Sequence, residues 1–223
     1  MHVVLGGGGS ASDEAAVLDC FASLVGVDGH VLYLPIAARD AETNPQRYVT
    51  WIESVLPPRG LRVAETWLSL CGHTPEQLYS FDGVVLGGGN TFELLHQLRM
   101  SGFADALVAF CKSGRTVYGG SAGAIVLGRD IASCASYDVD LRGMDDTRAL
   151  DLCASSSVWC HFEARHEALL AEYIERSNET LIVLGKAAGA LVTDDGVFGL
   201  GNGSAAIWSL ERRALLPMAS LVG

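Results

Sequence analysis

Three glycine-rich loops each follow a short apolar run, and this pattern constrains the fold more than any other feature. The loops occupy residues 6–9, 87–89 and 119–124, after the runs VVL, VVL and TVY. Each loop leads into a segment with helical periodicity. Repeated strand–loop–helix units predict an α/β chain with a mainly parallel sheet covered on both faces. Sites in such sheets lie at the carboxyl ends of the strands, so the three loops are expected to meet along one edge.

The rest of the chain extends this alternation. Further strands are expected at residues 31–35, 61–66, 158–162 and 181–184, and further helices are expected at 44–57, 103–112 and 163–177. A helix capped by Ser10 or Ser12 is expected to run to about Val25. From residue 189 onward the pattern changes to antiparallel hairpins, the first with an Asp195-Gly196 turn. The segment between 130 and 155 has no clear periodicity.

Composition limits the classes of protein that fit. A chain of 223 residues with 49% hydrophobic and 18% charged residues is expected to form one globular domain over 1–223. Its net charge of −11 argues against a nucleic-acid or anionic-membrane partner. The six cysteines include no CxxC pair, so buried reduced thiols are expected rather than a metal site. With no recognisable signal peptide or membrane span, we expect a cytoplasmic location.

The strongest local signal for chemistry is the segment YGGSAGA at residues 118–124. An apolar strand runs into a sharp turn, and small residues open the following helix, as in a nucleophile elbow. Ser121 would then be held out at the start of the helix, and the backbone N–H of Ala122 would face a developing oxyanion. The alternative is a tight turn in which the serine is an ordinary helix cap.

A serine nucleophile needs a general base, and His161 is the best placed of six histidines. It lies at the end of the predicted strand VWCHF, and functional sites of such sheets lie at the carboxyl ends of the strands. The alternative is that His161 is an ordinary histidine of the core or the surface, with no catalytic role. The loop GGGNT at 87–91 matches no dinucleotide or P-loop motif, so it is either a plain turn, a phosphate cradle or a second oxyanion donor.

LGGGNTFELL at 86–95, YGGSAGAIVLG at 118–128 and HF at 161–162, in this order and spacing, resemble the peptidase E and cyanophycinase family of serine peptidases. The resemblance covers nearly the whole chain. It implies a three-layer fold like that of the class I glutamine amidotransferases, with C-terminal antiparallel hairpins. Ser121 would be the nucleophile, His161 the general base, and Gly89 and Ala122 the donors of the oxyanion hole. No metal or organic cofactor is implied, and a homodimer is expected.

The chain departs from the family pattern at the acid that orients the histidine. The family carries G-L-P-E-G where this chain has GKAAG at 185–189, so Ala188 stands in place of the acid. Three alternatives remain open: another acid substitutes, a Ser-His dyad suffices, or the protein binds peptides without cleaving them. The acids nearest in sequence to the two catalytic segments are Asp130, Asp138, Asp140 and Glu163, and Asp138 is our candidate.

The family's substrate loop after the histidine is also missing, because this chain continues directly into EARH at 163–166. Arg165 is our candidate to bind an acidic substrate group, with Asn90 as a second contact, and a solvated arginine is the alternative. We therefore expect a serine peptidase that hydrolyses short peptides, mainly dipeptides with N-terminal aspartate. The alternatives are a cyanophycinase-like β-aspartyl peptidase, a weak or inactive homologue that binds a small acidic peptide or metabolite, and a nucleotide-binding domain.

Overall fold

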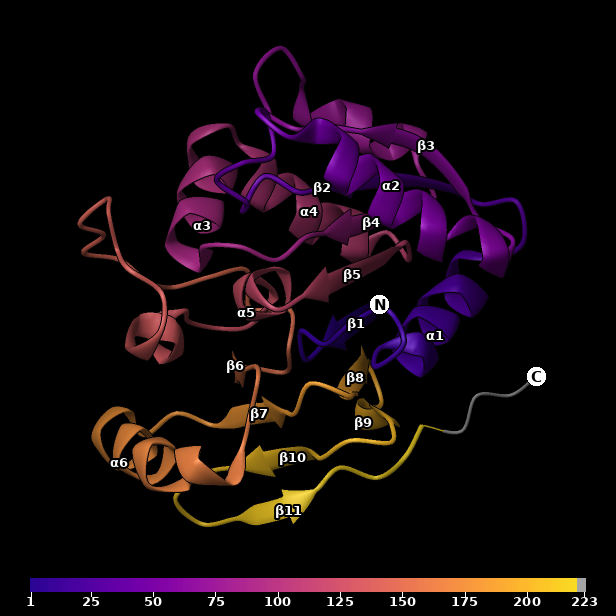
Figure 1. The fold of residues 1–223 in the computed structure, drawn as a ribbon. Coiled ribbons are helices and arrows are strands. Elements are labelled where there is room, and N and C mark those ends of the chain that lie inside the picture. The colour runs from indigo at the N-terminus through magenta and orange to yellow at the C-terminus, as the bar shows by residue number, and fades with distance from the viewer. Residues whose placement is uncertain (220–223) are drawn as a thin grey trace.

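The computed structural model describes residues 1–219 and contains a seven-stranded sheet of order β3-β2-β4-β5-β1-β8-β9 (Figure 1). The first five of these strands are mutually parallel, whereas β8 and β9 are antiparallel to their neighbours. The strands are β1 (His2–Gly6), β2 (His30–Leu34), β3 (Arg62–Thr66), β4 (Gly83–Leu86), β5 (Thr116–Gly120), β8 (Ala188–Thr193) and β9 (Gly196–Gly201). The predicted α/β class and mainly parallel sheet are confirmed.

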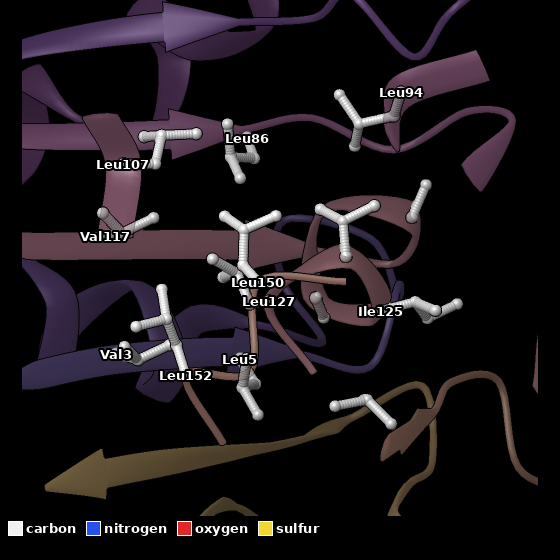
Figure 2. Close-up of a cluster of buried hydrophobic side chains, with 14 of the residues drawn as sticks. Val3, Leu5, Leu86, Leu94, Leu107, Val117, Ile125, Leu127, Leu150 and Leu152 are labelled. Atoms are coloured by element: carbon white, nitrogen blue, oxygen red, sulfur yellow. The ribbon is translucent and has the colours of Figure 1, made fainter. Parts of the chain in front are cut away.

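Helices cover both faces of this sheet because the side chains of each central strand alternate between two apolar cores. Val3 and Leu5 face the core formed with α3 (Thr91–Met100), α4 (Phe103–Lys112) and α5 (Ala122–Leu127). Figure 2 shows Val3 and Leu5 in this cluster with Leu94, Leu107 and Ile125. Val4 faces the opposite core, formed with α1 (Ala15–Val25) and α2 (Pro45–Val55). The period of two along β1 thus produces the three layers.

Four strands form a second sheet, which the alternation in the sequence did not separate from the first. Its order is β11-β10-β7-β6, from β6 (Ser157–Trp159), β7 (Leu181–Leu184), β10 (Ala205–Trp208) and β11 (Arg213–Leu215). One face packs against α6 (Glu167–Ser177), as Figure 1 shows. The physical reason is that β8 already occupies the free edge of β1, so the parallel pair β6–β7 has to extend elsewhere.

The predicted helices and turns are present with shifted ends. Helix α1 begins at Ala15 rather than at Ser10 or Ser12, because residues 11–14 form turns before it. The predicted hairpin joins β8 to β9, with its turn at residues 194–195, one residue before the predicted Asp195-Gly196, and Gly196 begins β9. Short segments of 3-10 helix are η1 (Pro57–Arg59), η2 (Pro75–Ser80), η3 (Ala132–Ser136) and η4 (Ala164–His166).

Two further observations bear on the expectations from composition. All six cysteines are free thiols, and Cys71 alone among them is exposed. Within residues 1–219, no helix has both the length and the apolar character to span a bilayer.

Candidate active site

Ser121 lies at a sharp turn between β5 and α5, at the carboxyl end of the parallel sheet. Its backbone has φ 53° and ψ −113°, a conformation that residues with a Cβ rarely adopt. The N–H of Ser121 donates to the carbonyl oxygen of Gly6 at the end of β1, at 3.1 Å. Strain of this kind persists only where the surroundings hold it, and it collects at functional sites. The geometry is that of the nucleophile elbow that the sequence predicts.

Glycines on both sides of Ser121 allow strand and helix to pass closely. A Cβ on Gly119 would lie 2.4 Å from the carbonyl group of Gly123, and a Cβ on Gly123 would lie 2.3 Å from the carbonyl oxygen of Leu86. Both distances are far below van der Waals contact. The small residues in YGGSAGA are therefore required by backbone packing, as the motif predicts.

The structure brings His161 directly to Ser121. Nε2 of the imidazole lies 2.7 Å from Oγ of Ser121, which is hydrogen-bonding distance. His161 follows β6 and has φ 55°, so its backbone is also in the left-handed region. Two chain segments 40 residues apart thus place a hydroxyl and a half-buried imidazole in the pairing that nucleophilic catalysis requires.

The first glycine loop, residues 6–9, supports the histidine. The N–H of His161 donates to the carbonyl oxygen of Gly7 at 3.0 Å. A Cβ on Gly8 would lie 2.2 Å from Cε1 of His161, so the ring rests on the bare Cα of this residue. Gly8 also has φ 90°. No residue of this loop was predicted to belong to the site, although the loop itself is visible in the sequence.

The two predicted oxyanion donors come from different segments of the site, the start of α5 and the second glycine loop. Ala122 is the first residue of α5, where backbone N–H groups have no partner within the helix. In the second glycine loop it is Gly88 that lies against Ser121, since a Cβ there would be 3.4 Å from the serine Cβ. Gly89 has φ 148° and packs against the carbonyl group of Ala37. The role of Gly89 stays a prediction, and the geometry adds Gly88 as a candidate.

Asp138 does not contact the histidine in the described part of the chain. Its Oδ2 accepts a hydrogen bond of 2.8 Å from the N–H of Thr91, at the N-terminus of α3. The free N–H groups and dipole of that helix end attract a carboxylate, which explains the placement. The prediction that Asp138 holds the imidazole by a hydrogen bond therefore differs from the structure. Ala188, at the position of the family's acid, is fully buried in β8.

The two predicted substrate contacts also lie away from Ser121. Oδ1 of Asn90 caps α3 by accepting from Glu93 N–H, and its Nδ2 donates to the carbonyl oxygen of Val139. Arg165 has a side chain that is 73% exposed and pairs with Glu163 at 3.1 Å. Neither side chain is brought to the serine, which matches the solvated alternative for Arg165.

A cavity of about 480 Å³ opens beside Ser121. All three glycine loops and Glu14 contribute to its lining, and α2 lines it through Arg47, Tyr48 and Trp51. Among the described residues that line this cavity, Arg47 is the only one with a positively charged side chain. Arg47 could not be predicted from the sequence, because the approach of α2 to the carboxyl edge of the sheet is a tertiary feature.

The comparisons with known proteins agree with this geometry. The model of peptidase family S51 matches residues 3–198. The chain belongs to peptidase family S51. The match spans all three glycine loops, Ser121 and His161, so the resemblance stated from the motifs is confirmed at the level of the family.

Solved structures agree with the S51 fold. A protein assigned as peptidase E from Listeria monocytogenes EGD-e superposes with a TM-score of 0.71 at 22% identity, over 90% of this chain and 98% of that one. A peptidase from an acI-B1 Actinobacterium superposes with a TM-score of 0.76 at 16% identity, over 98% and 95%. At these identities the likeness shows the fold alone.

One curated protein shares a shorter stretch with this S51 peptidase. It is a cobyric acid synthase from Syntrophobacter fumaroxidans (strain DSM 10017 / MPOB), 39% identical over 79 residues. The match covers 35% of this chain and only 15% of the synthase. It therefore carries no conclusion about the activity of this chain.

The surroundings of His161 lower the pKa of its imidazole below the ordinary value of 6.5. Burial has the largest effect, because it disfavours the charged ring, and the positive charge of Lys186 acts in the same direction. The carboxylates of Asp138 and Glu163 oppose the shift, while His166 adds to it. A lowered pKa keeps the imidazole neutral, as a general base must be, into mildly acidic solution.

We expect kcat/KM to decrease in acid with its midpoint below pH 6.5, because this decrease reports the protonation of the general base in the free enzyme. Replacing Lys186 by glutamine removes a positive charge near the ring and takes one of its two cationic partners from Glu163, which keeps only Arg165. Both changes favour the protonated imidazole, so the midpoint should move to higher pH. The matched control is Lys112→Gln, the other lysine of the chain, at the end of α4. A midpoint that stays in place in Lys186→Gln would contradict this account.

Within residues 1–219, no group of three or more histidine, cysteine, aspartate or glutamate side chains is arranged to hold a metal ion.

Proposed function

We propose that this S51 peptidase is a serine-type dipeptidase that hydrolyses short peptides through an acyl-enzyme on Ser121. The observation that carries the proposal is the 2.7 Å contact between Ser121 Oγ and His161 Nε2 on a strained strand–helix turn. His161 takes the hydroxyl proton as Ser121 attacks the scissile carbonyl carbon. It then gives that proton to the leaving amine, and water hydrolyses the ester by the reverse sequence.

Backbone groups are proposed to stabilise the tetrahedral oxyanion. The N–H of Ala122 opens α5, and Gly88 and Gly89 lie on the facing loop. In the described residues, the N–H groups of Gly88 and Gly89 donate to no other part of the chain. Donors held in place before the reaction need no reorganisation as the charge develops.

The preferred substrate is proposed to be a dipeptide with an N-terminal aspartate, with Arg47 as the receptor of its side chain. Arg47 lines the cavity beside Ser121, and its guanidinium lies 3.4 Å from the carboxylate of Asp40. Tyr48 donates a hydrogen bond to the same carboxylate. Asp40 thus holds the guanidinium at the rim, where a substrate carboxylate can bind to its remaining donors.

The first test is the release of free amino acid from Asp-X, Glu-X, β-Asp-X and neutral dipeptides. We expect Asp-X to be cleaved, whereas a cyanophycinase-like specificity would favour β-Asp-X. Labelling of the wild type with a fluorophosphonate, followed by mass spectrometry of the peptide containing Ser121, separates a working nucleophile from a binding pocket. A folded protein that neither cleaves nor labels would disprove the proposed function.

Replacing Arg47 by glutamine should raise KM for Asp-X about tenfold, equivalent to about 1.4 kcal/mol. KM for Asn-X should stay within twofold, because the amide carries no charge for the guanidinium to attract. The matched control is Arg165→Gln, which removes an exposed arginine on η4 that lies outside the cavity. An equal loss for Asp-X in the control, or none in Arg47→Gln, would contradict the assignment of Arg47.

The predicted homodimer and cytoplasmic location stay predictions, as does the expectation that nucleic acids and membranes are not partners. Sedimentation of the purified chain would test the first.

A further inference from the structure

Glu14 is a buried carboxyl group beside the active site that the proposed mechanism does not use. Its side chain is 3% exposed, and among residues 1–219 it is the only buried side chain of the types Asp, Glu, Lys and Arg. Burying a carboxyl group costs free energy unless hydrogen bonds compensate. Desolvation accordingly raises its pKa, and hydrogen bonds from the protein oppose that shift. A group kept at this cost is a candidate for a role beyond packing.

The hydrogen bonds of Glu14 tie the first glycine loop to the strand beneath it. Oε1 accepts from the N–H of Gly8 at 2.7 Å. Oε2 accepts from the hydroxyl group of Tyr118, which is buried in β5. A Cβ on Gly6 would lie 2.6 Å from both Oε1 and the tyrosine hydroxyl oxygen, so the carboxyl fills the space below the loop. Glu14 thus determines where Gly8 lies.

Gly8 in turn determines where the imidazole lies. The ring of His161 rests on the Cα of Gly8, and the neighbouring Gly7 accepts the hydrogen bond from His161 N–H. In the described residues no hydrogen bond reaches Nδ1 of His161, whereas Nε2 is hydrogen-bonded to Ser121. The contacts that hold the ring therefore come from the glycine loop rather than from a carboxylate behind it.

We propose that Glu14 is a positioning residue for His161, holding the loop at residues 6–9 under the imidazole in place of an acid on Nδ1. The proposal rests on the proposed function, because it assigns the support of the same Ser121–His161 pair. Glu14 touches no reacting atom in this scheme. Glu14 also lines the cavity beside Ser121, but the role proposed here is exerted through Gly8 on the placement of the base.

The test compares Glu14→Ala with Glu14→Gln. Alanine leaves the N–H of Gly8 and the hydroxyl of Tyr118 without their acceptor, so the loop and the ring above it should loosen. We expect kcat to fall about 30-fold with KM within twofold, because displacing a catalytic group by about 1 Å costs up to about 100-fold. Glutamine keeps the shape and accepts from Gly8, so it should restore kcat to within about threefold. Asp19→Ala removes an exposed acid of α1, the helix that begins directly after Glu14; it is the matched control and should leave kcat unchanged.

A second readout does not depend on cleavage. The titration of His161, followed by NMR of its imidazole, should move from a lowered pKa towards the ordinary value of 6.5 in Glu14→Ala, because a loosened ring is better hydrated. The charged groups that shift this pKa in the wild type, Lys186, Asp138, Glu163 and His166, are all retained in that variant. The titration in Glu14→Gln should match the wild type. If the alanine variant does not fold, Tyr118→Phe removes one hydrogen bond to Glu14 and should give the same changes at smaller size.

The outcomes separate the two proposals. Unchanged kcat and unchanged titration in a folded Glu14→Ala overturn the positioning role, and so does a glutamine variant as impaired as alanine. A lower melting temperature with kcat and titration intact would show a purely structural role and would also overturn it. If the wild type cleaves no peptide, the proposed function fails, and the titration of His161 still decides whether Glu14 positions the ring.

Discussion

Replacing Ser121 by alanine is expected to lower kcat for the best dipeptide by about 10⁴-fold, and His161→Ala should lower it nearly as much. The two groups act as a unit across the 2.7 Å contact, because the hydroxyl is a weak nucleophile until the imidazole removes its proton. The double variant should therefore be no slower than Ser121→Ala alone. Removing the serine or the histidine of a complete triad lowers kcat by about 10⁶-fold. The loss expected here is smaller, because a pair with no carboxylate on its histidine starts from a lower kcat.

The measurement is steady-state release of free amino acid, with thermal unfolding to show that each variant is folded. Ser113→Ala is the matched control, since Ser113 lies before β5, away from the carboxyl end where Ser121 lies. It should retain the activity of the wild type. Additive losses in the double variant would mean that His161 and Ser121 do not act together. Ser121→Ala retaining a tenth of the activity would reject Ser121 as the nucleophile.

Replacing Gly123 by alanine is expected to lower the free energy of unfolding by about 2 kcal/mol or more, although this position lies inside a helix. Helix propensity alone predicts a gain of about 1 kcal/mol for this change. The added methyl group, however, would lie 2.3 Å from the carbonyl oxygen of Leu86. Forcing backbone apart in a close-packed core costs about 1–3 kcal/mol or more, so the clash outweighs the propensity.

Chemical denaturation of Gly123→Ala and the wild type would measure this difference. The matched control is Gly185→Ala, because a Cβ on this buried glycine would meet its nearest atom at an ordinary 3.6 Å. Its free energy of unfolding should change by less than about 0.5 kcal/mol. A Gly123→Ala variant as stable as the wild type would show that β4 and α5 can separate at the elbow, contrary to the packing seen here.

The elements of the main sheet could be predicted from the sequence because their signals are local. An apolar run followed by glycine and a helical pattern places β1, β4 and β5, and the small residues around Ser121 report the close approach of strand and helix. The Asp195-Gly196 pair identifies the hairpin of β8 and β9 in the same way. Each signal involves residues within one turn or one strand of each other.

The division of the strands into two sheets could not be predicted from the sequence. Strands β6 and β7 have the same apolar pattern as the strands of the main sheet, but they pair with each other and form a separate sheet in which β7 also pairs with β10. Which strand takes the edge of β1 depends on a competition between segments far apart in the chain. Periodicity carries no information on that competition, since it reports burial and not the partner.

The candidate site also has one part that could be predicted from the sequence and another part that depends on tertiary packing. Sequence motifs and position were enough to select Ser121 and His161, and the structure brings the two side chains into contact. The support of the histidine was decided by tertiary packing: Asp138 lies at the helix end of α3, while Glu14, from a segment with no motif, lies under the glycine loop. Arg47 enters the cavity because α2 passes the carboxyl edge of the sheet. Residue types and spacing thus determined the proposed catalytic pair, whereas the groups around it depend on which surfaces the packed helices bring together.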